Sequence, residues 1–238
     1  MSAGSDISRD VLERNHLIKI DGLREPEHAA AAAAAGADLI GFIFAPARRQ
    51  VTPETAAACI AAARHEDSRR TVAAVGVFVN ASAESIRRVV AASGVDLVQL
   101  HGNESPGLLA DIPVPVFKAF RPRAGATAAA IHADVEGFSL ATNPPVLFVI
   151  DGYAPDASGG TGVRADWNLA AEIAAERPIL LAGGLNPENV GDAIRQVRPR
   201  GVDVSSGVEA VGVKDAARIK AFIRAARSAF LDLGDPRR

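Results

Sequence analysis

The sequence predicts an α/β fold of the TIM-barrel class, a single (β/α)8 barrel. Eight short runs rich in Val, Ile, Leu and Phe recur along the 238 residues, and segments of helical period separate them. The runs are almost continuously apolar, which is typical of parallel strands covered on both faces. The alternation leaves no stretch for a second domain, although a doubly wound open sheet is an alternative.

Each predicted strand is short and rich in large apolar residues. In order, the strands are Leu17–Ile20, Leu39–Phe44, Val72–Val79, Leu97–Leu100, Val116–Ala119, Val146–Ile150, Ile179–Ala182 and Val202–Val204. We expect residues 16–231 to form the barrel, with a flexible N-terminal extension over residues 1–15 and a tail over residues 232–238.

Helical periodicity follows most of the strands, and two boundaries carry specific signals. Gly36 is a good C-terminal stop, and Thr52 is an N-cap in front of a proline at the first helical position. The predicted helices are Pro26–Ala35, Pro53–Arg64, Ala83–Ala92, Trp167–Ala175, Pro187–Val197 and Lys214–Phe230, with weaker signals over Ser105–Leu109 and Thr127–His132.

Composition and charge exclude several classes of function. A formal net charge of −2 gives no electrostatic footprint for nucleic acid or an anionic membrane. Cys59 is the only cysteine, so neither an intrachain disulfide nor a Cys-rich metal site can form. The polar N-terminus has no signal-peptide core, and Gly36 and Asp38 interrupt the most apolar stretch, Ala29–Ala45. We therefore expect a cytoplasmic protein.

Polar residues recur just after the predicted strands, where a barrel places its reacting groups. In chain order they are Asp21, Arg48, Arg49, Asn80, His101, Glu104, Asp151, Gly183, Gly184, Ser205, Ser206 and Gly207. Two of them, Asp21 and Asp151, are carboxylates that could act as an acid/base pair across the barrel mouth. The alternative is that each simply caps the loop or helix that follows it.

Two glycine-bearing turns predict a phosphate site. Gly183 and Gly184 follow the seventh strand, and Ser205, Ser206 and Gly207 follow the eighth. Glycine lets the backbone approach a ligand closely, and N–H groups at the start of a short helix attract an anion. In barrels, these two loops are the frequent phosphate-binding place.

A third glycine-rich stretch, Ser158–Gly162, follows Asp151 after a polar loop. It reads either as a flexible linker or as a loop that closes over a second anionic group.

Several of these motifs resemble the phosphoribosylanthranilate isomerases of tryptophan biosynthesis, from about Leu17 to Arg227. The matching stretches are Ala35–Phe42, Gly76–Asn80, Val98–Gly102, Gly159–Gly162, Leu181–Leu185 and Gly201–Glu209. The resemblance implies a barrel without metal or organic cofactor. It also implies a small-molecule phosphoribosyl substrate, N-(5-phosphoribosyl)anthranilate, and its Amadori rearrangement to the 1-deoxyribulose product.

The same resemblance implies roles for individual residues. Asp151 matches the acid that protonates the furanose ring oxygen, and Asp21 stands where the family has a catalytic Cys as base, in Lys19-Ile20-Asp21-Gly22. Arg49 matches an arginine that interacts with the anthranilate carboxylate, although Arg48 could fill that role because the loop is shorter than usual.

Further substrate contacts follow from the resemblance. Asp203 matches a substrate-contacting carboxylate, and His101 is expected to contact the substrate. Gly183, Gly184, Ser205, Ser206 and Gly207 map to the phosphate cradle. One departure is the stretch Gly162–Ala165, where family members usually have a Lys after the glycine.

A carboxylate in place of the thiol changes the base. A free carboxyl group has a pKa about 4.6 units below that of a thiol, which corresponds to about 6 kcal/mol of proton affinity. Burial and Asp151 would recover part of this basicity. The similar isomerase of histidine biosynthesis uses an Asp after its first strand, but its two-fold repeat is not evident here.

Three hypotheses therefore remain open. The chain is an active phosphoribosylanthranilate isomerase with an Asp base, a paralogue that isomerises another N-linked ribose phosphate, or a phosphosugar-binding barrel without turnover. We expect a monomer or a homodimer.

Overall fold

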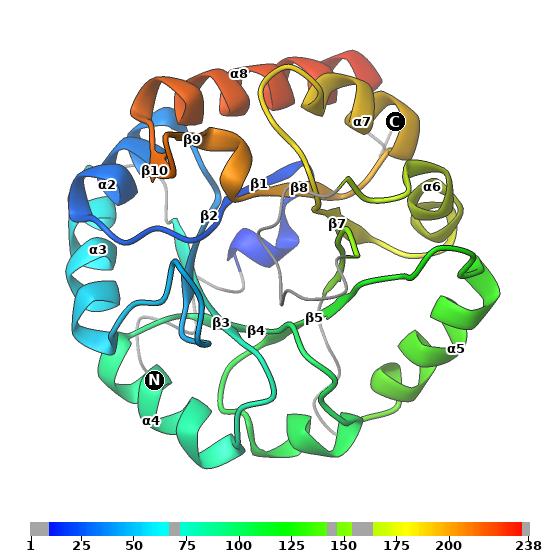
Figure 1. Cartoon of the computed structure of the whole chain (residues 1–238), viewed down its shortest axis with the longest axis horizontal. Coiled ribbons are helices and arrows are strands. Elements are labelled where there is room, and N and C mark those ends of the chain that lie inside the picture. The colour runs from blue at the N-terminus through cyan, green and yellow to red at the C-terminus, as the bar shows by residue number, and fades with distance from the viewer. Residues whose placement is uncertain (1–9, 67–71, 142–146, 154–163, 235–238) are drawn as a thin grey trace.

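The computed structural model describes residues 10–66, 72–141, 147–153 and 164–234, and within them it confirms the predicted barrel (Figure 1). Eight parallel strands form a closed ring in chain order. The ring closes where β1 pairs with β8, with Leu17 opposite Gly201 and Ile20 opposite Val204. This pairing excludes the open doubly wound sheet.

The strands match the predicted runs to within one or two residues. They are β1 (Leu17–Ile20), β2 (Leu39–Ile43), β3 (Ala73–Phe78), β4 (Leu97–Leu100), β5 (Val116–Phe120), β6 (Leu147–Ile150), β7 (Ile179–Leu181) and β8 (Gly201–Val204). Val146, which was expected to begin the sixth strand, lies outside the described residues.

Helices surround the ring and cover the outer face of the strands (Figure 1). They are α2 (Pro26–Ala35), α3 (Pro53–Glu66), α4 (Ala83–Ser93), α5 (Ala128–Ser139), α6 (Trp167–Glu176), α7 (Val190–Val197) and α8 (Ala216–Leu233), with the short 3₁₀ helices η1 (Pro106–Asp111) and η2 (Ser206–Val208). In the part of the chain described, no helix is both long and apolar enough to cross a membrane.

Several helix boundaries differ from the sequence prediction, and the physical reason is visible at some of them. The weakly predicted helix after β5 runs on to Ser139, because Thr127 caps its first turn and apolar side chains continue beyond it. The helix expected from Pro187 begins at Val190. The helix expected from Lys214 begins at Ala216, because Asp215 accepts a hydrogen bond from the Arg218 amide as its N-cap.

Lys214 instead belongs to a small antiparallel hairpin that the sequence did not predict. The hairpin consists of β9 (Glu209–Ala210) and β10 (Val213–Lys214), with Lys214 paired opposite Glu209. It projects from the end of β8 beside the barrel mouth (Figure 1).

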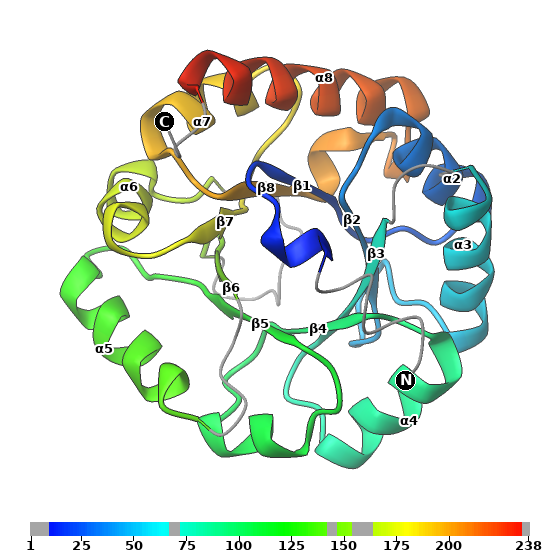
Figure 2. The ribbon, with the colours of Figure 1, turned by 180° about the vertical axis from the view of Figure 1, so that it is seen from behind.

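The opposite end of the barrel is closed by the N-terminal segment, seen over the ring in Figure 2. Residues 10–13 form a helical turn, and Val11 is fully buried among residues that begin strands, including Leu17, Leu39 and Leu97. The Arg200 guanidinium donates to the Leu12 carbonyl. Residues 10–13 therefore pack against the barrel, which differs from the loosely held arm expected for them.

Candidate active site

The site lies at the C-terminal end of the strands, where β1 and β8 bring three charged residues together. The Lys19 ammonium sits 3.1 Å from Asp21 Oδ1 and 2.9 Å from Asp203 Oδ2. Lys19 is fully buried, and Asp21 and Asp203 are 8% and 6% exposed. Lys19 therefore holds two carboxylates side by side in a largely dry environment.

The two carboxylates titrate differently. Burial favours the neutral form of Asp21, but the charge of Lys19 outweighs it, and the pKa of Asp21 lies below its usual value. For Asp203, burial prevails over Lys19, and the negative charges of Asp21 and Asp151 add to it, which raises the pKa of Asp203 to about 6. At neutral pH, Asp21 is thus a carboxylate that can accept a proton.

Asp21 fits because β2 has a glycine beside it. A Cβ atom built on Gly41 would lie 1.8 Å from Asp21 Oδ1, well inside contact distance. The glycine therefore provides the space that the carboxylate occupies between β1 and β2.

Asp151 follows β6 and is held by two donors. Its Oδ1 accepts a hydrogen bond of 2.7 Å from the Gly152 amide, and its Oδ2 lies 3.1 Å from His101 Nε2. The Gln99 amide nitrogen lies 2.9 Å from His101 Nδ1 and can only donate, so in this arrangement His101 Nε2 carries the proton that points to Asp151. His101 is buried and orients the Asp151 carboxylate.

The two predicted phosphate turns pack directly against each other. A Cβ atom on Gly207 would lie 1.8 Å from the Leu185 carbonyl oxygen, so only glycine permits this approach of the turns after β7 and β8. A Cβ atom on Gly183 would lie 2.4 Å from the Gly152 amide, next to Asp151. Ser205 Oγ donates to the Asp21 carbonyl at 3.3 Å. The turns therefore adjoin both candidate catalytic carboxylates.

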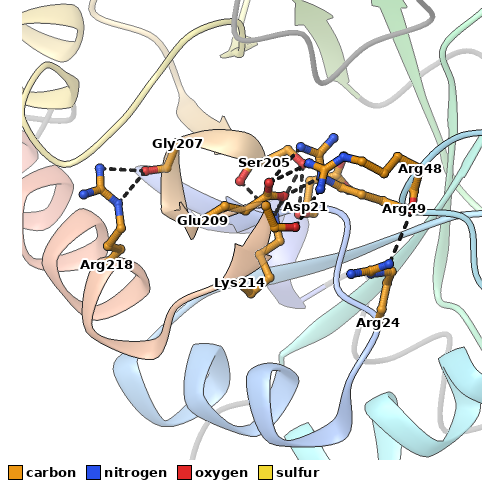
Figure 3. Close-up of polar contacts among 10 residues, drawn as sticks. Asp21, Arg24, Arg48, Arg49, Ser205, Gly207, Glu209, Lys214 and Arg218 are labelled. Carbon is orange, nitrogen blue, oxygen red and sulfur yellow. Dashed lines mark hydrogen bonds and ion pairs between the residues drawn. The ribbon is translucent and has the colours of Figure 1, made fainter.

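Figure 3 shows a cationic cluster beside Asp21 and Ser205, arranged around the Glu209 carboxylate. Glu209 lies within ion-pair distance of Arg48, Arg49 and Lys214, at 2.7, 2.5 and 3.5 Å. Three cations around one carboxylate leave a local excess of positive charge around Glu209. Such an excess suits an anionic ligand.

Burial and neighbouring charges shift the pKa values of Glu209 and Lys214 in this cluster. Burial opposes ionisation of Glu209, but hydrogen bonds from Arg49 and Arg48 lower its pKa to about 2. Burial lowers the pKa of Lys214 to about 8. The Lys214 ammonium donates to the Ser205 carbonyl at 2.8 Å, which ties the cluster to the phosphate turn.

A cavity of about 280 Å³ opens beside Asp151, lined also by Tyr153, Arg123 and Arg164. A larger hollow of about 640 Å³ lies farther out, between β5 and α5. Its buried cation, Lys118, already pairs with Glu104 at 2.8 Å. Among the residues that the structure describes, no group of three or more His, Cys, Asp or Glu side chains is arranged to hold a metal ion.

Comparison with known proteins identifies the family. Residues 18–225 match the sequence profile described as N-(5'phosphoribosyl)anthranilate (PRA) isomerase. The chain belongs to this family. A curated N-(5'-phosphoribosyl)anthranilate isomerase of Roseiflexus sp. (strain RS-1) is 46% identical over 215 residues, which cover 89% of this chain and 98% of that protein.

Solved structures of PRA isomerases share the fold. The phosphoribosyl anthranilate isomerase from Thermotoga maritima has a TM-score of 0.75 and 34% identity, covering 90% of this chain and 99% of that one. A second structure, with a TM-score of 0.73, 33% identity and the same coverage, is a complex with reduced 1-(o-carboxyphenylamino)-1-deoxyribulose 5-phosphate.

Most residues expected at the site lie around one mouth, but two do not face it. Glu104 and Asn80 form a support for the loops, because Glu104 accepts hydrogen bonds from Lys118 and from the amides of Asn80 and Gly102. The third glycine-rich stretch, Ser158–Gly162, lies outside the described residues, so both of its interpretations remain open.

Three residues of the site were not assigned a role from sequence. They are Lys19, Glu209 and Lys214. Lys19 carried a usable signal, since a lysine within the buried apolar run Leu17–Ile20 needs a charged partner. Glu209 and Lys214 gave no comparable signal, because their contact depends on the hairpin.

Proposed function

We propose that the protein isomerises N-(5'-phosphoribosyl)anthranilate to 1-(2-carboxyphenylamino)-1-deoxyribulose 5-phosphate, a step of tryptophan biosynthesis. The observation that carries the proposal is the arrangement of Asp21 and Asp151 around the paired phosphate turns, in a chain that belongs to the PRA isomerase family. No cofactor takes part in the steps below.

Asp151 acts as the general acid in the first step. Its protonated form gives a proton to the furanose ring oxygen, the bond from C1′ to that oxygen breaks, and the anthranilate nitrogen lone pair forms the C1′=N bond of a protonated Schiff base. His101 and the Gly152 amide fix the direction of the carboxyl group.

Asp21 acts as the general base in the second step. Its carboxylate removes the proton from C2′, and the electron pair left on carbon forms a C1′=C2′ double bond while the nitrogen becomes neutral. The resulting enolamine tautomerises to the ketone. Lys19 keeps Asp21 ionised and ready to accept the proton, and Gly41 leaves room for it.

The substrate has two anionic groups, a phosphate and a carboxylate. The backbone amides of the two phosphate turns suit the first, and the arginines suit the second. The phosphate lies on the turns with Gly183, Gly184, Ser205, Ser206 and Gly207. The anthranilate carboxylate lies toward the arginines that surround Glu209, and Asp203 contacts the sugar hydroxyls. The excess positive charge of the arginine cluster supports this orientation.

Turnover of enzymatically generated N-(5'-phosphoribosyl)anthranilate by the purified protein tests the proposal, with product identified by chromatography. We expect turnover that falls by at least about 100-fold in Asp151→Asn. A tryptophan auxotroph that lacks this isomerase should grow with the native gene. No turnover by the native protein, combined with turnover of a phosphoribosyl aminoimidazole carboxamide, would instead favour the paralogue that isomerises another N-linked ribose phosphate.

We place the activity in the cytoplasm, where a biosynthetic step of this kind has its substrate. We propose that the protein is a monomer or a homodimer. Light scattering coupled to size-exclusion chromatography distinguishes the two.

A further inference from the structure

We propose that Glu209 is a positioning residue, which fixes the Arg49 guanidinium for the carboxylate on the aromatic ring of the substrate. The inference rests on the proposed function, because it concerns how that substrate is recognised. The sequence analysis assigned no role to Glu209, so this inference adds a residue to the site.

The contact between Glu209 and Arg49 is two-pronged. Arg49 Nε donates to Glu209 Oε1 at 2.5 Å, and a terminal Arg49 nitrogen donates to Oε2 at 3.1 Å. Two parallel hydrogen bonds between a planar guanidinium and a carboxylate fix orientation as well as distance. Lys214, at 3.5 Å, is farther from the same carboxylate and donates mainly to the Ser205 carbonyl. Glu209 therefore binds the Arg49 guanidinium more closely than the Lys214 ammonium.

Burial distinguishes Arg49 from its neighbour Arg48. The Arg49 side chain is 7% exposed and the Arg48 side chain is 54% exposed. A Cβ atom on Gly22 would lie 2.7 Å from Arg49 Cδ, so the Arg49 stem passes directly over the residue that follows Asp21. Arg48 instead donates to the Gly212 carbonyl at 2.6 Å, in the turn of the hairpin. Arg49 is thus the arginine that stands beside the catalytic carboxylate.

Glu209 is itself held rigidly enough to position another side chain. It begins β9 and pairs in register with Lys214 on β10. Arg48 bridges the hairpin by binding both Glu209 and the Gly212 carbonyl. An orienting residue of this kind is effective because its own geometry is fixed by surrounding contacts.

Glu209 touches no group that exchanges a proton with the substrate in the proposed mechanism. Its loss should therefore weaken binding of the aromatic carboxylate and leave the chemical step largely intact. A residue needed only for folding would affect every substrate equally.

A pair of substrates separates these cases. The native protein and Glu209→Gln are compared on N-(5'-phosphoribosyl)anthranilate and on N-(5'-phosphoribosyl)aniline, which lacks the carboxylate. We expect KM for the anthranilate compound to rise about tenfold in the variant with kcat within about twofold, because one charge-assisted contact is misdirected. The KM for the aniline compound should change by less than about twofold.

A double-variant cycle tests whether the effect runs through Arg49. If Glu209 acts by positioning Arg49, Glu209→Gln combined with Arg49→Lys should be no worse than Arg49→Lys alone. Glu136→Gln is the matched control, since Glu136 pairs with Arg177 at 2.8 Å on the exposed outer helices and should leave both substrates unaffected. Melting temperatures of all variants report folding.

Equal losses on both substrates, no loss on either, or additive effects in the double variant would overturn the inference. Absence of any turnover by the native protein would instead refute the proposed function, so the two failures are distinguishable. If Glu209→Gln does not fold, the KM ratio of the two substrates in Glu209→Asp gives the same comparison, because the shorter carboxylate cannot keep both hydrogen bonds.

Discussion

Lys19 shows how one buried side chain can set the chemistry of two others. Its ammonium lies between Asp21 and Asp203 and keeps Asp21 ionised. For Asp203 it opposes burial and the neighbouring carboxylates, which nevertheless raise the pKa to about 6. An aspartate in water is a weak base, and Lys19 makes Asp21 weaker still. What Asp21 gains is a fixed position and permanent ionisation, which substitute for the higher proton affinity of a thiolate.

His101 allows a test of roles at the residue scale. Because its Nε2 donates to Asp151, we expect His101→Asn to lower kcat about tenfold and to leave KM within about twofold. His65→Asn is the control, since the His65 side chain is 87% exposed. A rise in KM with unchanged kcat would show that His101 binds the substrate, as the sequence suggested, rather than orienting the acid.

Lys214 predicts a pH dependence. Its pKa is lowered to about 8, so its ammonium is lost as the pH rises through that value. The substrate phosphate, whose second pKa is about 6, is already fully charged in this range. We therefore expect kcat/KM to fall above about pH 8 in the native protein and to stay level in Lys214→Arg, because arginine remains charged. An identical fall in both proteins would assign the titration to another group.

The sequence predicts the eight barrel strands well, but it does not predict the β9–β10 hairpin. The apolar runs of β1 to β8 were evident because each is buried on both faces, and the strand-end carboxylates followed from their positions. The β9–β10 hairpin was not evident, because Lys214 and Asp215 continue the helical pattern of α8 and only the N-cap contact of Asp215 ends it. The arginine cluster depends on that hairpin, so no local pattern could reveal it.

Gly41 tests the fit between two neighbouring strands. An alanine Cβ at this position would overlap Asp21 Oδ1, which must then leave its place beside Lys19. We expect Gly41→Ala to lower kcat by about 100-fold, the usual effect of displacing a catalytic group by about 1 Å. Gly107→Ala is the control, since the nearest atom to a Cβ there is 3.9 Å away. Full activity in Gly41→Ala would show that catalysis does not require the position of the Asp21 carboxylate seen beside Lys19.

At the scale of the whole molecule, the two ends of the barrel have separate tasks. The proposed catalytic residues lie at the C-terminal ends of the strands, while Val11 and the residues that begin the strands fill the other end. The sequence indicated the first end through its strand-end polar residues. It did not indicate the second, because a single valine in a polar segment gives no periodic signal.

Val11 separates stability from activity. Removing its two methyl groups should lower the free energy of unfolding by about 2 kcal/mol, because the side chain is fully buried. Urea unfolding of Val11→Ala measures this, and kcat/KM should be unchanged in native buffer. Val211→Ala is the matched control, since Val211 is completely exposed. Equal stability of Val11→Ala and the native protein would show that residues 10–13 do not contribute to the barrel floor.

If the Asp21 carboxylate removes the C2′ proton, its loss should slow the release of deuterium from C2′-labelled substrate to solvent. Asp21→Asn keeps the shape of the side chain and removes the base, and Asp192→Asn, an exposed aspartate paired with Arg195, is the control. We predict that Asp21→Asn slows deuterium loss by at least about 1,000-fold while the control matches the native protein. Deuterium loss from Asp21→Asn within about tenfold of the native rate would show that another group removes the C2′ proton.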